Sequence, residues 1–215
     1  MPYAGNMPKK KLQPTKIILL EAARSALAEK GHSQFSMRSV AKAAGVHLRT
    51  VQYYFPTKRD LLTEVLEYTI STYYIGQYQV TRNNYAGLAP EKKLENVLGF
   101  LIDDLKEPFV CQFFPEVWAL ASRDADAAAA LDRFYIMHRQ SIAAIITEMR
   151  PELPARVIAQ RAAIVGMMSE GMLLLIGHGK PQHSELRGIR AEIIRQAKNI
   201  IYSPESTSSA AGDRS

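Results

Sequence analysis

Apolar residues recur at intervals of three and four along most of this chain, and no convincing run alternates apolar with polar residues as a strand does. The first stripe predicts a helix that opens at Pro14 or Thr15 and ends at Gly31, because glycine often follows a helix. Its apolar positions are Leu19, Leu20, Ala23 and Leu27. The pattern predicts an all-α protein.

Three predicted helices follow, and a turn at Gly45 separates the first of them from the second. Ser36 is a good N-cap for a helix that ends near Ala44. After Gly45, a third helix is expected over about residues 47–54, and Pro56 stops it. Thr57 then caps a longer fourth helix.

The remaining elements are longer, and their stripes predict a helical bundle. Helices are expected over residues 90–106, 114–122, 124–149 and 155–177, and over a last segment that contains the stripe Ile189, Ile193, Ile194, Ala197, Ile200 and Ile201. The tail is rich in Ser, Ala and Gly and should be disordered. We divide the chain into a flexible basic arm (1–14), a small helical domain (15–62), a larger one (63–202) and the tail (203–215). Met7 is an alternative start to Met1.

Positive charge is concentrated at the N-terminus. Residues 1–60 contain eleven Lys or Arg and three acids, a net charge of +8, whereas the whole chain carries +6. A basic head on a slightly acidic body indicates a polyanionic partner, although a solvated charged face has the same composition. The segment Lys9–Lys11 fits a flexible basic arm better than a nuclear address.

The spacing of small residues in 36–58 is typical of a helix-turn-helix. Ala41 is small enough for two helices to cross, Gly45 tolerates positive φ at the turn four residues later, and Val51 is an apolar anchor six residues further on. Val40, Val46 and Leu27 would complete the core. An ordinary helical hairpin is the alternative interpretation of this spacing.

Residues 15–65 resemble the DNA-binding domain of TetR-family transcriptional regulators. The resemblance rests on Leu19-Leu20, Ala22-Ala23, Gly31, Ser36-Met37-Arg38-Ser39-Val40-Ala41, Ala44-Gly45-Val46, Thr50, Tyr53-Tyr54-Phe55-Pro56, Lys58 and Leu61-Leu62. It implies that the third helix enters the major groove. Beyond residue 65 the chain matches the family only in length, helix content and general pattern.

The resemblance also implies a set of DNA contacts. Arg38, Arg49, Thr50 and Gln52 could reach bases, Arg pairing with guanine and Gln with adenine. Ser36, Tyr53, Tyr54 and Lys58 match phosphate-binding positions, which orient the protein without reading sequence. Two residues depart from the family pattern: His47 stands where a capping Ser is usual, and Gln52 where many members have Tyr. His47 could still contact DNA.

The family couples such a head to a domain that binds a small molecule and forms a homodimer. We expect the last two helices to form a four-helix interface between subunits. Its apolar residues would be Val157, Ile164, Val165, Met168, Met172 and Leu175 on one helix and Ile193, Ile194, Ile200 and Ile201 on the other. Some of these residues would instead pack inside one subunit. Aromatic and soft side chains of the middle helices are candidates for an effector site, chiefly Phe114, Trp118, His138 and Met172.

The resulting hypothesis is a ligand-responsive regulator, a repressor that binds a palindromic double-stranded operator as a homodimer and is released by a small-molecule effector. We expect a cytoplasmic, nucleoid-associated protein with no membrane contact, no cofactor and no metal. No histidine pair or catalytic motif supports an enzyme. The rivals are an architectural, effector-independent DNA-binding protein and a helical enzyme with a basic head.

Overall fold

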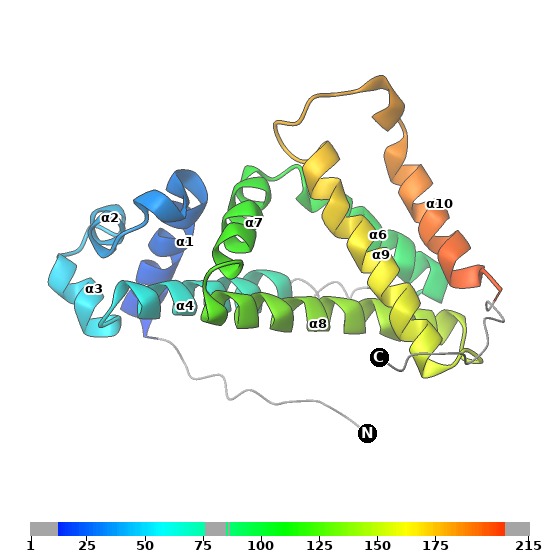
Figure 1. Cartoon of the computed structure of the whole chain (residues 1–215), viewed down its shortest axis with the longest axis horizontal. Coiled ribbons are helices and arrows are strands. Elements are labelled where there is room, and N and C mark those ends of the chain that lie inside the picture. The colour runs from blue at the N-terminus through cyan, green and yellow to red at the C-terminus, as the bar shows by residue number, and fades with distance from the viewer. Residues whose placement is uncertain (1–12, 76–84, 86, 205–215) are drawn as a thin grey trace. The chain divides into compact units, whose positions relative to one another are not determined.

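The computed structural model describes residues 13–75, 85 and 87–204. The predicted arm up to residue 12 and the predicted tail from residue 205 lie outside these residues. The helices are α1 (Pro14–Gln34), α2 (Met37–Ala43), α3 (Leu48–Tyr54), α4 (Lys58–Thr69), α6 (Pro90–Asp104), α7 (Pro108–Ala121), α8 (Ala125–Met149), α9 (Ala155–Ile176) and α10 (Ile189–Tyr202) (Figure 1). A π-helical stretch, Ile70–Ile75, continues α4, and a short 3₁₀ turn, Ser184–Leu186, precedes α10. The described residues contain no strand, so the all-α prediction is confirmed.

The chain divides into two compact units. Unit 1 comprises residues 1–77 and 112–131, and unit 2 comprises residues 78–111 and 132–215. Helices α7 and α8 therefore each contribute residues to both units. Unit 1 is larger than the predicted DNA-binding domain because parts of α7 and α8 pack with the first four helices. These units are defined by packing, and the functional boundaries at 15–62 and 63–202 stay a prediction.

Local sequence signals explain where the helices of unit 1 begin and end. Pro14 lies in the first turn of α1, where its missing N–H leaves no bond unmade. Gly31 adopts φ 70° and interrupts α1 at the predicted end, after which a single further turn runs to Gln34. Thr57 caps α4 through its hydroxyl, which accepts a hydrogen bond from the Asp60 N–H at 3.1 Å.

The core of unit 1 is made of apolar side chains at helical spacing. Leu27, Val40 and Val51 are fully buried, as the helix-turn-helix pattern predicts, whereas Val46 is only partly buried. Phe35 and Phe55 add large rings to the same core. Both phenylalanines lie next to helix ends, so they fix the chain where it turns.

Unit 2 has its own apolar core between α6, α8, α9 and α10. It comprises Leu94, Val97, Leu98, Ile142, Ile145, Ile146, Leu153, Ile158, Ala162, Val165, Ala197 and Ile201. Arg161 is buried in α9 and its guanidinium donates to the carbonyl oxygens of Ile201 and Ser203, which are orphan acceptors at the end of α10. The C-terminal helix is thereby held against α9.

One predicted boundary is wrong. The sequence places the start of a helix near Phe114, but α7 begins six residues earlier, at Pro108. Pro115 lies inside this helix, where it removes one backbone hydrogen bond without ending the helix. Pro108 is compatible with a first helical turn, where its missing N–H leaves no bond unmade.

Candidate nucleic-acid interface

The turn between α2 and α3 has the geometry that the sequence predicts. Gly45 adopts φ 65°, a conformation that costs side-chain-bearing residues free energy, and a Cβ there would meet nothing within 4 Å. The requirement for glycine is therefore conformational. The Val46 N–H donates to the Ala41 carbonyl at 3.0 Å and closes the turn. Ala41 is 4% exposed, so its methyl group lies in the helix-crossing interior.

A reciprocal capping box fixes the start of α2. The Ser39 N–H donates to Ser36 Oγ at 3.1 Å, and the Ser36 N–H donates to Ser39 Oγ at 3.0 Å. Ser36 Oγ uses only an acceptor lone pair in this bond, so its O–H is still able to donate to a DNA phosphate. One side chain can thus cap the helix and contact the backbone of DNA.

Two substitutions at Ser36 separate these roles. Ser36→Ala removes the cap and should lower the free energy of unfolding by about 1 kcal/mol in thermal or urea denaturation. Ser36→Asp keeps a capping oxygen and should retain stability, but its charge repels phosphate and DNA affinity should fall. Equal DNA affinity for Ser36→Asp and the wild-type protein would contradict the phosphate contact.

Helix α3 presents one polar face and one buried residue. Val51 is 0% exposed, whereas Arg49 and Gln52 on either side of it are exposed. Tyr53 is 79% exposed and Thr50 is partly buried. Among the candidate DNA-contact residues, Arg49, Gln52 and Tyr53 therefore lie on the open side of the second helix of the motif.

His47 precedes α3 and is exposed, but its side chain makes no capping hydrogen bond. Its backbone carbonyl accepts from the Thr50 N–H at 2.9 Å. The departure from a capping Ser thus leaves an amide of the first turn without a side-chain partner within the helix. The imidazole is left available for a base or a phosphate.

Tyr54 has a structural contact that the sequence does not predict. Its hydroxyl donates to Gln13 Oε1 at 2.9 Å, which ties the end of α3 to the start of α1. A phosphate only accepts hydrogen bonds, so Tyr54 would have to release Gln13 to donate its single proton to DNA. The Lys58 ammonium is 5.8 Å from the centre of the Phe35 ring, a cation–π contact that leaves its charge exposed.

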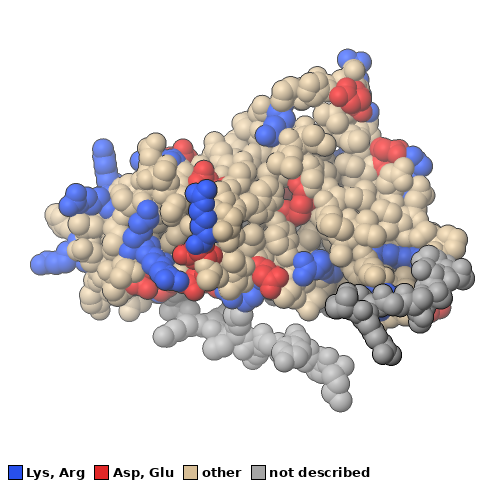
Figure 2. Space-filling model, viewed as in Figure 1, with Lys and Arg blue, Asp and Glu red and all other residues tan. Residues whose placement is uncertain are grey.

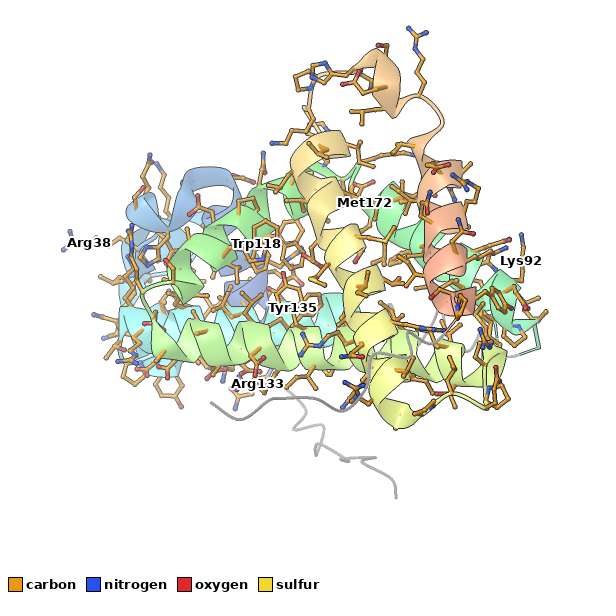
Figure 3. The ribbon with its side chains drawn as sticks, turned by 45° about the vertical axis from the view of Figure 1, so that its right-hand side comes forward. Arg38, Lys92, Trp118, Arg133, Tyr135 and Met172 are labelled. Carbon is orange, nitrogen blue, oxygen red and sulfur yellow. The ribbon has the colours of Figure 1, made fainter. Side chains whose placement is uncertain are left out.

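Internal ion pairs divide the cations of unit 1 into two groups. Lys16 pairs with Glu64, Arg24 with Glu21 and Arg59 with Asp126, at 2.5, 2.8 and 2.7 Å. Five other cations between residues 13 and 60 are exposed and have no ion pair among the described residues: Lys30, Arg38, Lys42, Arg49 and Lys58. Lys and Arg side chains project from the part of unit 1 that carries α2 and α3 (Figure 2). Arg38 is labelled in Figure 3, where it points away from the ribbon.

The four candidate effector residues fall in different units. Phe114 and Trp118 belong to unit 1, one turn apart on α7, with ring centroids 6.2 Å apart. His138 and Met172 belong to unit 2 and are both buried. Figure 3 labels Trp118 on α7 and Met172 on α9.

Two polar pairs join α8 to α9 in unit 2, and one of them includes His138. Its Nε2 lies 3.1 Å from Ser169 Oγ, and burial, helped by Arg139, lowers the pKa of its imidazole to about 4. The imidazole is therefore neutral at physiological pH. The Tyr135 hydroxyl donates to Glu170 at 2.9 Å, and burial raises the pKa of that carboxyl. No pattern in the sequence marks Glu170 as a site residue.

The fold and the exposed face of α3 define a helix-turn-helix DNA-binding protein. Within residues 13–75, 85 and 87–204, no three His, Cys, Asp or Glu side chains are grouped as metal ligands. Residues 19–65 match the family model of bacterial regulatory proteins of the tetR family. Residues 19–65 therefore form a DNA-binding domain of the TetR type.

Known relatives support this assignment over different lengths. The chain is 34% identical over 92 residues to the HTH-type transcriptional regulator CymR of Pseudomonas putida, a match that covers 43% of this chain and 42% of that protein. A TetR transcription regulator from Haloarcula marismortui has a TM-score of 0.68 and 16% identity, over 87% of this chain and 96% of that one. A protein from Saccharomonospora viridis, described as a transcriptional regulator and solved in complex with choline, has a TM-score of 0.66 and 18% identity, over 86% and 94% of the two chains. At these identities the structural similarities concern the fold.

Proposed function

We propose that this chain is a ligand-responsive repressor, which binds a palindromic operator as a homodimer and is released by a small molecule. The observation that carries the proposal is the face of α3, where exposed Arg49 and Gln52 flank the buried anchor Val51. Long polar side chains held in this way can reach base edges in the major groove. The protein would act in the cytoplasm, at the nucleoid, without catalysis.

An exposed apolar stripe on α9 supports the homodimer. Ile164, Met167, Leu174 and Leu175 are 41%, 65%, 60% and 63% exposed, and Gly171 lies among them. They recur at intervals of three and four, so they share one side of the helix, opposite the buried Ala162, Val165 and Leu173. A second copy of this chain is the occupant that we propose for this stripe.

Length and composition alone would also let α9 cross a membrane, and it is the only helix of the described residues that meets this test. It packs in unit 2 on one side, and 39% of its most apolar window is buried. Buried Arg161 and partly buried Glu170 lie within it. Apolar residues on both sides of one helix are equally expected where a core and a subunit interface share it.

A small-molecule effector completes the proposed function. One structural neighbour was solved with choline, which supports a small-molecule site in this chain. We propose Phe114, Trp118, His138 and Met172 as its candidate residues, on the aromatic and apolar character that such sites share. An effector with unequal affinity for the DNA-competent and DNA-incompetent states would shift the population between them and release the operator.

Operator selection from random DNA tests the proposed function. Wild-type protein should select a palindrome with half-sites about 34–36 Å apart, or a multiple of that spacing. Arg49→Ala and Gln52→Ala should each weaken the selected site by roughly 1–3 kcal/mol and relax the preference at one base pair of each half-site. Arg156→Ala, an exposed cation at the start of α9, is the control and should leave the motif unchanged. If neither α3 substitution alters the motif, sequence is read elsewhere, with Arg38 and His47 the next candidates.

A further inference from the structure

The Glu116 carboxylate of α7 bonds the backbone where the chain turns from α1 into α2, a corner formed by residues 31–35. Glu116 Oε2 accepts a hydrogen bond from the His32 N–H at 2.7 Å, across 84 residues of sequence. This amide directly follows the interruption of α1 at Gly31. Both residues belong to unit 1. A short bond from an amide to a carboxylate is stronger than one between neutral groups.

The backbone of Gly31 is shaped around this carboxylate. A Cβ at residue 31 would lie 2.9 Å from Glu116 Oε1 and 3.1 Å from Cδ, closer than side chains tolerate. Gly31 also has φ 70°, which a side chain would strain. At Gly45 only the φ angle requires glycine, because its surroundings are open. At Gly31 both the φ angle and the close approach of the Glu116 carboxylate require it.

The corner that Glu116 holds leads directly into the DNA-binding motif. From His32 the chain makes one turn to Phe35, whose N–H donates to the Gly31 carbonyl at 3.1 Å. The Phe35 ring is buried beneath the Lys58 ammonium, and Ser36 next to it caps α2. Two of the candidate phosphate contacts, Ser36 and Lys58, thus take their positions from the corner that Glu116 fixes.

We infer that Glu116 is a positioning residue for operator recognition: it touches no DNA, but its carboxylate sets the orientation of α2 and α3 through the Gly31–His32 backbone. The inference rests on the proposed function, since it presumes a specific operator. It also links α7, which carries the candidate effector residues Phe114 and Trp118, to the DNA-binding motif by one hydrogen bond.

Electrostatics and positioning predict opposite signs for the loss of this carboxylate. Removing a negative charge from a DNA-binding unit should leave affinity for any DNA unchanged or slightly increased, because DNA is a polyanion. Loss of a positioning contact should lower the affinity for the operator alone, because only specific binding requires side chains to meet base edges. The ratio of operator to random-sequence affinity therefore isolates the positioning role.

The experiment compares full-length wild type with Glu116→Ala, Glu116→Asp, Glu116→Gln and Glu29→Gln. The probes are the operator selected by the wild-type protein and a random duplex of the same length, measured by fluorescence anisotropy. Glu116→Ala should lose about tenfold in operator affinity, the equivalent of one charge-assisted hydrogen bond, without losing random-sequence affinity. Glu116→Asp keeps the charge but withdraws the acceptor by one carbon, and should lose affinity as well. Glu116→Gln retains an acceptor oxygen for a neutral hydrogen bond and should lose less affinity than Glu116→Ala and Glu116→Asp.

Glu29→Gln is the matched control for charge. Glu29 is exposed on α1, two residues before Gly31, and forms no ion pair among the described residues. Its neutralisation should leave the ratio of affinities unchanged. Hydrogen exchange of the peptide containing His32 supplies a direct readout, because its amide should exchange faster in Glu116→Ala and Glu116→Asp than in Glu116→Gln.

The outcomes separate this inference from the function on which it rests. If wild-type protein selects no DNA sequence, the proposed function fails. If it selects one, and Glu116→Ala and Glu116→Asp keep the wild-type ratio of affinities, only the positioning role is overturned. An equal loss on operator and random DNA would also overturn it and would leave Glu116 a merely stabilising contact. Should Glu116→Ala not fold, Glu116→Asp against Glu116→Gln decides the question.

Discussion

Operator binding should weaken by a factor of about 10³ to 10⁵ when the salt concentration rises from about 50 mM to about 200 mM. The reason is the set of five exposed cations between residues 13 and 60 that have no ion pair among the described residues, namely Lys30, Arg38, Lys42, Arg49 and Lys58. The proposed dimer would present two such sets. If it neutralises about 6 to 10 phosphates, the logarithm of the binding constant should fall by about 0.9 per phosphate for each unit of log salt.

Single substitutions measure how much each cation contributes to this salt dependence. Lys58→Ala should weaken binding to all sequences alike and reduce the slope by about one for each subunit, because a phosphate contact carries no sequence information. Lys180→Ala, which removes an exposed cation from unit 2, is the matched control and should leave the slope unchanged. Titrations by anisotropy at four or five salt concentrations measure these slopes. A flat dependence for the wild-type protein, or a Lys58→Ala loss confined to one base pair, would contradict the assigned contacts.

The parts of the fold that the sequence predicts well depend on short-range chemistry. Ser36 and Thr57 cap helices through residues three positions away, and Gly45 turns the chain by its own φ angle. Such signals are local, so they can be read without knowing what packs against them. The predicted start of α7 at Phe114 is wrong for the complementary reason: Pro108 is compatible with a first helical turn but does not by itself establish one, because proline is also common in turns.

The contacts that the sequence does not predict join residues that are far apart in the chain. The Tyr54 hydroxyl meets Gln13 across 41 residues, and Glu116 meets His32 across 84. Each depends on the packing of whole helices, and neither residue type carries a pattern that names its partner. Tyr54 therefore matches a phosphate-binding position in sequence while its hydroxyl is engaged within the protein.

The sequence also does not predict which side of α9 is buried in the subunit and which side is exposed. It is apolar around most of its circumference, so periodicity predicts a broad face without dividing it. The structure divides it: Val165 and Met172 are 0% and 5% exposed and belong to the interior of unit 2, whereas Ile164 and Leu175 lie on the exposed stripe. Ile194 of α10 packs partly buried against the core of unit 2. A charge at Ile194 would therefore disturb the subunit's own fold as well as any interface, and the exposed stripe offers a cleaner test.

Leu174→Glu should convert the proposed dimer into a monomer at micromolar concentration. Leu174 is 60% exposed in the single chain, so a glutamate there is solvated in the monomer and leaves its fold intact. In a dimer the same carboxylate would be buried in an apolar interface without a charge partner, which costs several kcal/mol. Gln140→Glu adds the same charge at an exposed position of α8 that is not part of the stripe, and should remain dimeric. Sedimentation velocity measures the mass, and thermal unfolding checks that the monomer is folded.

Leu174→Glu should also weaken operator binding, because a monomer carries only one DNA-binding domain. In a dimer, binding of one recognition helix to its half-site raises the effective concentration of the second recognition helix at the other half-site. A monomer lacks this effect, so operator affinity should fall by about 10² to 10⁴ in Leu174→Glu. The variant should still prefer a half-site over random DNA, because Arg49 and Gln52 are unchanged, and it should no longer depend on the spacing between half-sites. A folded Leu174→Glu protein that stays dimeric would place the interface away from the α9 stripe. A monomeric variant with undiminished operator affinity would instead show that a single head suffices, and the homodimer would then have no role in recognition.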